Sequence, residues 1–398
     1  MSVPFAVTDA AGAIVDPAAD SAERAELRRT VRAVVEREAP DERTRRLDEA
    51  EEFDDLLYDG LARTGVLGIA ASEDQGDLRD QLVVVEELAA GPTSMAAFMI
   101  GHYAVTGALR RFGTTERHRD VLDQLTAGTT KVSFALSEPE GGTDVARIMR
   151  TRADPMPDGG YRLGGHKMWT SGAADAGWII VMARTSPITR SAADGITMFL
   201  VPTSAEGLSV ETIATFGIRS HSTCEVLLND VVVASDAVLG AVDRGMRQAF
   251  EAVNREGLLA AAASIGVARG ALALAVSYAL ERHVFSKPIG AFQVPQHWLV
   301  DSAVALESAR GLMIRAAEVE VGGGDAANLA AMAKLVASEA AGDITIRGMQ
   351  LMGGMGFTRD MAMQRLFRDG RLWSFSPLTN EMVRNGLGQR LLGLPRSF

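Results

Sequence analysis

The sequence predicts an α+β protein with an N-terminal α-helical domain, a middle antiparallel β domain and a C-terminal four-helix-bundle-like domain. The hydrophobic pattern changes twice along the 398 residues, and these two changes predict the three domains. Helix-period apolar residues dominate up to residue 127, short strand-like runs follow, and long Ala-rich segments begin after residue 240. We therefore expect domains at residues 1–127, 128–240 and 241–398.

The N-terminal region opens with a helix-start signal, because Asp20 and Glu23 have the spacing of a capping box. This signal predicts a polar helix over Ser21–Glu38. Further helices, rich in Ala, Leu and Met, are expected around Asp54–Thr64, Gln81–Ala90, Thr93–Phe112 and Thr115–Leu125.

The middle region has the pattern of β-strands. Trp178–Met182 and Ile196–Val201 are short apolar runs, and turn clusters such as Pro157–Gly160 separate such runs. Alternation over Cys224–Val233 predicts a strand with one solvated face.

The C-terminal region is helical again. Met246–Phe285 is apolar nearly all round and predicts one long buried bundle helix. Two more long helices are expected at Pro295–Val321 and Asp325–Met352, with Asp325 as N-cap after three glycines. Two shorter helices are expected at Asp360–Arg368 and Thr379–Leu392.

Composition and simple motif searches argue against several classes of function. The net charge of −11 argues against a nucleic-acid partner, which needs a basic face. The single Cys224 excludes an intramolecular disulfide framework and fits a reducing compartment. The apolar tract Gly257–Val267 is broken by Arg269 and is too short to span a bilayer, so we expect a cytoplasmic protein without a membrane partner. The sequence contains no dinucleotide-binding glycine motif after an early strand, no P-loop and no paired metal-ligand spacing, so no metal site is expected.

Five motifs, in order along nearly the whole chain, resemble those of the acyl-CoA dehydrogenase family. They are Phe134–Val145, Gly165–Gly172, Gly217–Val226, Glu281–Gly290 with Gln293 and Gln296, and Gln350–Phe357 with Arg368 and Asp369 beyond. Any one motif would be weak evidence, and all five on a helix–strand–helix layout are a specific signal. A lone Trp169 also fits a core aromatic, and the lone glycines also fit turns.

The resemblance implies FAD as the cofactor. It places Ser137 as a donor to the flavin ring edge, Thr143 near the substrate's pantetheine arm, Trp169 over the ring and Ser171 near the hydride-accepting nitrogen. The full set of implied FAD contacts is Phe134, Leu136, Ser137, Gly142, Thr143, Trp169, Thr170, Ser171, Arg282, Phe285, Phe292, Gln293, Gln350, Gly353, Gly354, Thr379 and Glu381.

Part of this set implies an oligomer. By resemblance, Arg282 pairs with the FAD diphosphate of a neighbouring subunit, as a bidentate guanidinium can. Gln350, Gly353 and Gly354 reach the same neighbouring cofactor. The expected assembly is a homotetramer, built as a dimer of dimers.

The family reaction needs a carboxylate to remove the α-proton of an acyl thioester while the β-hydrogen leaves as hydride to the flavin. In most members this glutamate precedes a Gly-Thr pair near the C-terminus, and that position here is Pro377. A subset, including isovaleryl- and long-chain acyl-CoA dehydrogenases, carries it on the long helix. An ungapped count back from Tyr278–Arg282 places it at Glu256, where the following apolar run should raise its pKa.

Several alternatives remain open at this stage. Glu256 also fits an ordinary helix carboxylate at a solvated end, and Glu381 is the rival base. The implied substrate contacts are Thr143, Asn254, Arg255 and Glu256, but Gly257 stands where the family commonly has an arginine.

The expected function is desaturation of an acyl thioester of CoA or of an acyl-carrier protein, with electrons passed to an electron-transfer flavoprotein. One alternative is a specialised member with altered regiochemistry or O₂-dependent hydroxylation. Another is a non-catalytic FAD-binding subunit of a hetero-oligomer.

Overall fold

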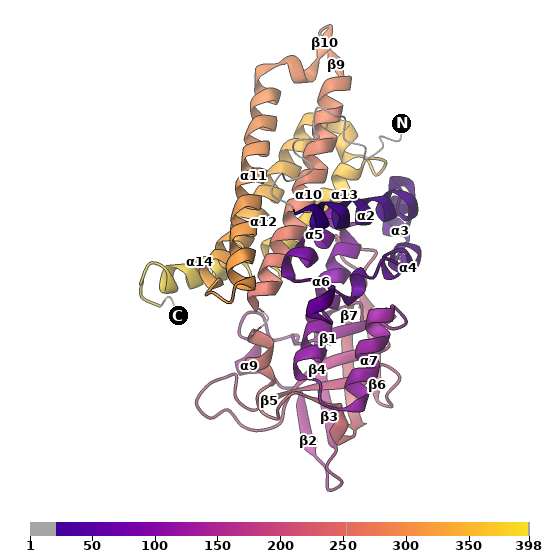
Figure 1. Cartoon of the computed structure of the whole chain (residues 1–398), viewed down its shortest axis with the longest axis vertical. Coiled ribbons are helices and arrows are strands. Elements are labelled where there is room, and N and C mark those ends of the chain that lie inside the picture. The colour runs from indigo at the N-terminus through magenta and orange to yellow at the C-terminus, as the bar shows by residue number, and fades with distance from the viewer. Residues whose placement is uncertain (1–20, 252, 397–398) are drawn as a thin grey trace.

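Helices from both ends of the chain pack together, and a β domain lies at one end of this helical body (Figure 1). The computed structural model describes residues 21–251 and 253–396. The N-terminal helices are α2 (Ala22–Glu38), α3 (Asp41–Ala50), α4 (Asp55–Ala62), α5 (Leu78–Ala89), α6 (Thr93–Phe112) and α7 (Glu116–Ala127). The expected capping residue Asp20 lies outside the described residues, and Ser21 caps α2 by accepting a hydrogen bond from the Arg24 amide at 3.3 Å.

Two N-terminal helix starts differ from the sequence prediction. The sequence does not predict α3, because Leu47 and Ala50 are its only apolar residues. Helix α5 begins at Leu78, before its apolar periodicity becomes clear, because Asp77 and Asp80 form a reciprocal capping box there.

The β domain is a single mixed sheet. In the described part of the chain its strands follow the order β6-β7-β3-β2-β4-β5-β8, and β1 pairs with β4. They are β1 (Val132–Ala135), β2 (Arg152–Pro155), β3 (Tyr161–Ser171), β4 (Trp178–Arg184), β5 (Ile196–Pro202), β6 (Leu208–Ile213), β7 (Thr223–Val233) and β8 (Val238–Leu239). Most pairs are antiparallel as expected, but β1 and the first residue of β2, Arg152, pair parallel with β4. Parallel pairing needs a long connection between the two strands, and the chain between β1 and β4 includes α8 (Val145–Ile148), β2 and β3.

Strands β4 and β5 are buried on both faces, which explains their unbroken apolar sequences. One face carries Phe199 and Val201 in a core within the sheet. The other face packs Ile180 and Leu200 against α6 and α7, including Leu109. This packing attaches α6 to the β domain.

The C-terminal region differs from the prediction of one helix over Met246–Phe285. Helix α9 (Gly245–Phe250) precedes α10 (Val253–Glu281), and a hairpin of β9 (His283–Val284) and β10 (Lys287–Pro288) follows. The helix cannot continue through Phe285 and Ser286, because their φ angles are +47° and +67°. The remaining helices are α11 (Gln293–Val321), α12 (Ala327–Met352), α13 (Ala362–Gly370) and α14 (Asn380–Arg390). The expected cap Asp325 accepts from the Ala327 amide at 3.0 Å, although Ala326 is the N-cap residue.

Helix α10 is the central element of the helical body. It approaches α5 closely at Gly266 and Gly270, where an added Cβ would lie 2.3 Å from the Glu86 carbonyl oxygen and 2.2 Å from that of Ala90. Its segment Arg255–Glu281 is long and apolar enough to cross a membrane by composition, and 89% of its most apolar window is buried inside the fold. Among the described residues, it is therefore the core helix of the bundle.

A buried cluster of charges joins the N-terminal helices to the C-terminal bundle. Glu87 on α5 accepts from Arg28 of α2 at 2.6 Å and from Arg269 of α10 at 2.5 Å. Its neighbour Glu86 accepts from Arg310 of α11 at 2.9 Å. Burial alone would raise the pKa of Glu87, but Arg269 and Arg28 lower it to about 2. The carboxylate is therefore ionised and paired at neutral pH.

We predict that Glu87→Gln lowers the free energy of unfolding by about 3–5 kcal/mol, because it removes the nearer counter-charge of the buried Arg28 and Arg269 and leaves them the more distant Glu86 at 3.4 and 4.0 Å. Chemical denaturation measures this. Glu26→Gln is the control, because Glu26 forms an exposed pair with Arg29 and its loss should change stability by less than about 0.5 kcal/mol. Equal effects of the two substitutions would contradict the prediction.

Candidate active site

The structure brings together the two middle-domain motifs that the sequence assigns to flavin. Strand β1 runs from Phe134 toward Leu136 and Ser137, and β3 ends with Trp169, Thr170 and Ser171. The Met168 amide donates to the Ser137 carbonyl oxygen at 2.9 Å, which joins the two segments directly.

Trp169 is held in an unusual backbone conformation. The β3–β7 register shifts between Lys167 and Thr170, and Trp169 has a φ of +62°. This bulge turns the indole outward, and the side chain is 57% exposed. Trp169 is therefore not a core aromatic, and its ring is free to cover a planar ligand.

Two further features of this region fit a bound flavin. The Thr170 hydroxyl is buried and has no hydrogen-bond partner among the described residues. A Cβ added at Gly142 would meet no described atom within 4 Å, so the loop that also carries Thr143 borders open space. A buried hydroxyl without a partner fits a contact to a polar cofactor. Thr143 itself is exposed, as a contact to a substrate arm would need.

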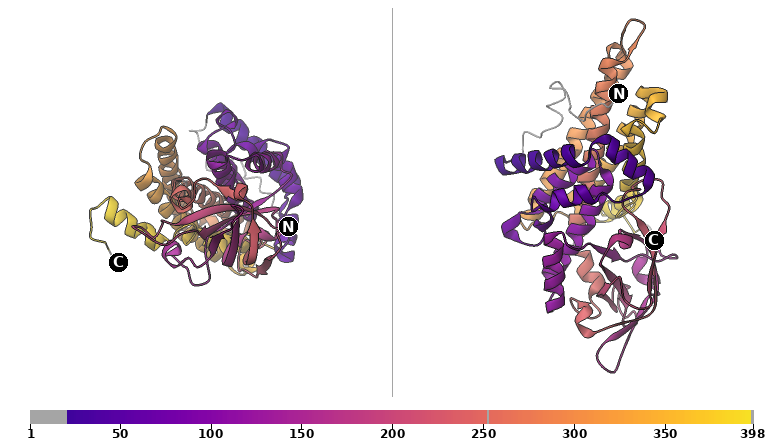
Figure 2. Two further views of the ribbon diagram at one scale, coloured as in Figure 1. Left: turned by 90° about the horizontal axis from the view of Figure 1, so that it is seen from below. Right: turned by 90° about the vertical axis from the view of Figure 1, so that its right-hand side faces the viewer.

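A second group of implied FAD contacts lies at the opposite end of α10. Arg282 follows α10 directly, and Phe285 at the hairpin tip is 92% exposed. Phe292 packs edge-on against Phe285 with ring centroids 6.5 Å apart, and Gln293 begins α11. This hairpin extends away from the β domain in both side views (Figures 1 and 2).

The C-terminal end of α12 belongs to the same distant group. A Cβ added at Gly348 would lie 3.7 Å from Ala275 Cβ, so the last turns of α12 lie beside the last turns of α10. Gln350, Gly353 and Gly354 follow immediately. A Cβ at Gly353 or Gly354 would meet no described atom within 4 Å, which leaves room for a ligand.

Glu256 lies in the first turn of α10, where α10 approaches the β domain (Figure 1). Glu256 is half-buried, desolvation of its carboxyl raises the pKa of that group to about 7, and no charged neighbour among the described residues opposes this shift. Its neighbour Arg255 pairs with Glu320 at 3.5 Å. The side chain of Asn254, an expected substrate contact, lies outside the described residues.

The segment around Pro377 is anchored by residues that sequence reasoning missed. The buried Lys334 on α12 donates to the Leu378 carbonyl oxygen at 2.6 Å and to Asn380 Oδ1 at 2.7 Å. Thr379 uses its hydroxyl to cap α14 at the Met382 amide. Glu381 is exposed, and its own backbone hydrogen bond lowers the pKa of its carboxyl. Only the three-dimensional contacts identify Lys334, because it is 44 residues from Leu378.

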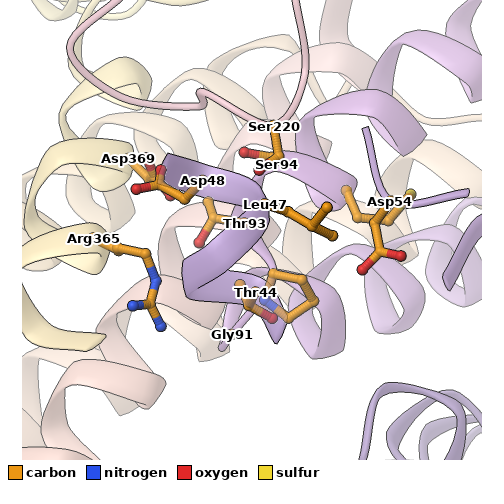
Figure 3. Close-up of a pocket in the computed structure, with 12 residues that line it drawn as sticks. Thr44, Leu47, Asp48, Asp54, Gly91, Thr93, Ser94, Ser220, Arg365 and Asp369 are labelled. Atoms are coloured by element: carbon orange, nitrogen blue, oxygen red, sulfur yellow. The ribbon is translucent and has the colours of Figure 1, made fainter. Parts of the chain in front are cut away.

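A separate pocket opens between α3, the start of α6 and α13 (Figure 3). Its charged lining is largely paired internally, because Asp48 accepts from Arg368 at 2.7 Å. Asp369 accepts from the Ile218 amide at 2.6 Å, and this contact joins the third motif to the last one. None of the implied flavin or substrate contacts lines this pocket, so it is not the candidate active site.

The comparisons with known proteins match the whole described fold. Family models for the acyl-CoA dehydrogenase N-terminal, middle and C-terminal domains match residues 21–129, 133–231 and 243–392. A probable short/branched chain specific acyl-CoA dehydrogenase of Dictyostelium discoideum is 32% identical over 82% of this chain and 79% of that protein.

Solved structures give the same result. Butyryl-CoA dehydrogenase from Megasphaera elsdenii has a TM-score of 0.89 and 28% identity, with 94% of this chain and 99% of that chain covered. A glutaryl-CoA dehydrogenase from Mycobacterium smegmatis in complex with FADH2 has a TM-score of 0.89 and 25% identity, with 95% and 96% covered. The chain therefore belongs to the acyl-CoA dehydrogenase family, and it is an FAD-dependent oxidoreductase that acts on CH–CH bonds.

Proposed function

We propose that this protein desaturates an acyl thioester, carried by CoA or by an acyl-carrier protein, and that Glu256 is the base. The observation that carries the proposal is the desolvation of Glu256 in the first turn of α10, which raises its pKa to about 7. A general base works best when its pKa lies near the working pH. The carboxylate would take the α-proton of the thioester.

The other residues of the site have supporting roles. When bound, FAD supplies the acceptor for the hydride that leaves the β-carbon. Ser137 would donate to the flavin ring edge, and Trp169 would cover the ring and keep water away from it. Thr143 would contact the arm of the thioester.

Two observations favour Glu256 over Glu381 as the base. The Glu381 residue is exposed and the pKa of its carboxyl is lowered, so it is a weak proton acceptor at neutral pH. It also stands in the first turn of α14, where the helix dipole stabilises the ionised form. Glu256 has a raised pKa instead, because the protein around it desolvates the carboxyl.

We predict that Glu256→Gln lowers the rate of flavin reduction by at least about 10²–10⁴-fold, because glutamine keeps the shape but cannot accept the proton. Anaerobic stopped-flow absorbance with a panel of CoA and carrier-protein thioesters measures the rate. FAD and thioester binding should survive. Glu381→Gln is the matched control and should have a comparatively mild effect.

The two variants together decide the assignment. If Glu256→Gln reduces flavin at the wild-type rate while Glu381→Gln does not, Glu381 is the base. If neither change matters with any thioester that reduces the wild type, the chemistry begins with neither glutamate.

The raised pKa also predicts a pH dependence. The base must be ionised, so flavin reduction should rise as the pH rises through about 7 and level off above it. Since folding raises this pKa from 4.5, the ionised group destabilises the fold above pH 7 and has no such effect below 4.5. Glu256→Gln should therefore unfold at a higher temperature than the wild type at pH 8 but not at pH 4. Calorimetry at both values, with no difference at pH 8, would contradict the shift.

We also propose that two copies of the chain complete each FAD site. Arg282 directly follows the last residue of α10 and lies 26 positions beyond Glu256, which corresponds to about 39 Å at 1.5 Å per residue. One chain therefore presents its flavin-ring contacts and its diphosphate contacts at opposite ends. An antiparallel second copy would bring its Arg282 and Gln350 to the first copy's cofactor, and a homotetramer built as a dimer of dimers satisfies all sites.

We predict that Arg282→Ala weakens FAD binding by roughly tenfold or more, the loss expected for a charge-assisted hydrogen bond, and loosens the oligomer as well. Fluorescence titration of the apoprotein and analytical ultracentrifugation measure the two effects. Arg29→Ala is the control, because Arg29 is exposed and pairs with Glu26 of its own helix. A folded Arg282→Ala protein with wild-type affinity and assembly would show that Arg282 contacts neither cofactor nor partner.

The electrons must leave the reduced cofactor, and we propose an electron-transfer flavoprotein as their acceptor. Reoxidation by a purified electron-transfer flavoprotein, compared with reoxidation by O₂, tests this. Faster turnover with O₂ would favour the hydroxylating alternative.

Pro377 favours a second candidate, a specialised member of the family. Proline has no N–H, so it cannot supply the backbone donor that normally helps bind the thioester oxygen. The regiochemistry of the product distinguishes α,β-desaturation from desaturation elsewhere in the chain. A protein that binds FAD, but whose flavin no thioester bleaches, would instead be a non-catalytic subunit.

A further inference from the structure

A fully buried ion pair lies directly behind the junction of β1 and β3. The Lys167 side chain is 0% exposed. Its Nζ donates to Glu138 Oε1 at 2.9 Å and to the Leu136 carbonyl oxygen at 3.0 Å. Desolvating two charges is costly, and such a pair is weak evidence for stability alone. Its position therefore calls for another explanation.

Glu138 is fixed by more than its partner lysine. Its Oε2 accepts from the Arg150 amide at 2.6 Å, and its Oε1 accepts from the Thr151 amide at 2.9 Å. Burial opposes ionisation of Glu138, but Lys167 and these hydrogen bonds hold the pKa of the carboxyl below its usual value. Burial lowers the pKa of Lys167 to about 8, so the pair is charged at neutral pH. A carboxylate held by three donors cannot swing away.

These bonds immobilise three consecutive residues around Ser137. Lys167 holds the Leu136 carbonyl, the Met168 amide holds the Ser137 carbonyl at 2.9 Å, and the Glu138 side chain is anchored below. The Ser137 side chain is the part that remains available. On the opposite strand, Lys167 immediately precedes the bulge that turns Trp169 outward.

We infer that Lys167 and Glu138 are positioning residues that aim Ser137 and Trp169 at the flavin. The inference rests on the proposed flavin contacts of those two residues. Groups that orient a ligand-contacting residue often matter nearly as much as the contact itself. An ion pair with a purely structural role would instead affect stability and leave flavin binding and colour unchanged.

The test removes the pair without leaving one charge unpaired. Lys167→Met with Glu138→Gln replaces both charges, and the side-chain amide oxygen of the introduced glutamine can still accept from one of the two backbone amides, those of Arg150 and Thr151, that the two carboxylate oxygens bind. We expect this double variant to fold, with FAD affinity lowered by roughly 10–100-fold, by analogy with the range found when groups that orient metal ligands are removed. We also expect a shifted flavin absorption band. Equilibrium titration of the apoprotein and the visible spectrum give both readouts without turnover.

A control and a second variant make the result decisive. Arg28→Met breaks a comparably buried ion pair with Glu87 in the helical body and should lower stability without changing the flavin spectrum. If the double variant fails to fold, Glu138→Gln alone keeps Lys167 paired to an amide oxygen and should show a smaller shift in the same direction. Wild-type affinity and spectrum in the folded double variant, or in Glu138→Gln when it alone folds, would overturn the inference.

Ser137→Ala distinguishes a failure of the positioning role from a failure of the Ser137–flavin contact itself. If Ser137→Ala shifts the flavin spectrum and the ion-pair variants do not, the flavin site stands and the positioning role fails. If Ser137→Ala also leaves the spectrum and affinity unchanged, the flavin contact of Ser137 is itself wrong, and the inference falls with it.

Discussion

Two neighbouring carboxylates, Glu86 and Glu87, are buried in α5, and they can both be ionised only where enough cations surround them. The cations come from α2, α10 and α11, as Arg28, Arg269 and Arg310. Because the partners are far apart in sequence, the N-terminal helices and the C-terminal bundle satisfy these charges only in one mutual arrangement. That arrangement fixes α10, and α10 in turn carries Glu256 at one end and Arg282 at the other.

The three-part fold could be predicted because long segments have a strong local period. Helix α6 is one example, since its bounds follow from its apolar pattern alone. Other elements depend on contacts between distant residues or on backbone conformations, which a local period does not reveal. Helix α3 is stabilised by contacts such as the Asp48–Arg368 pair, and no local pattern predicts such a contact. The left-handed conformations of Phe285 and Ser286 keep α10 from reaching Phe285, although the apolar pattern continues to that residue.

The candidate site also has residues that the sequence could predict and residues that it could not. Residues that contact ligand through short contiguous motifs, such as Ser137 and Trp169, could be predicted from resemblance. Their supports could not, because Lys167 and Glu138 are 29 residues apart and their pairing depends on the β1–β3 junction. Lys334 is a further example, since its role appears only when the Leu378 carbonyl comes within 2.6 Å. A sequence shows what touches the ligand more readily than what holds that contact in place.

The polar groups around Pro377 are used in structural contacts, so we expect the base to lie elsewhere in the site. The Leu378 carbonyl is bound by Lys334, and the Thr379 hydroxyl caps α14, so neither group is available for proton transfer. Glu256 has a pKa set by burial and by no hydrogen-bond partner among the described residues. A thioester that displaces water from the first turn of α10 would desolvate this carboxylate further and raise its pKa again. The proton affinity of Glu256 would then be greatest when the substrate is in place, so the base becomes strongest where the α-proton must be removed.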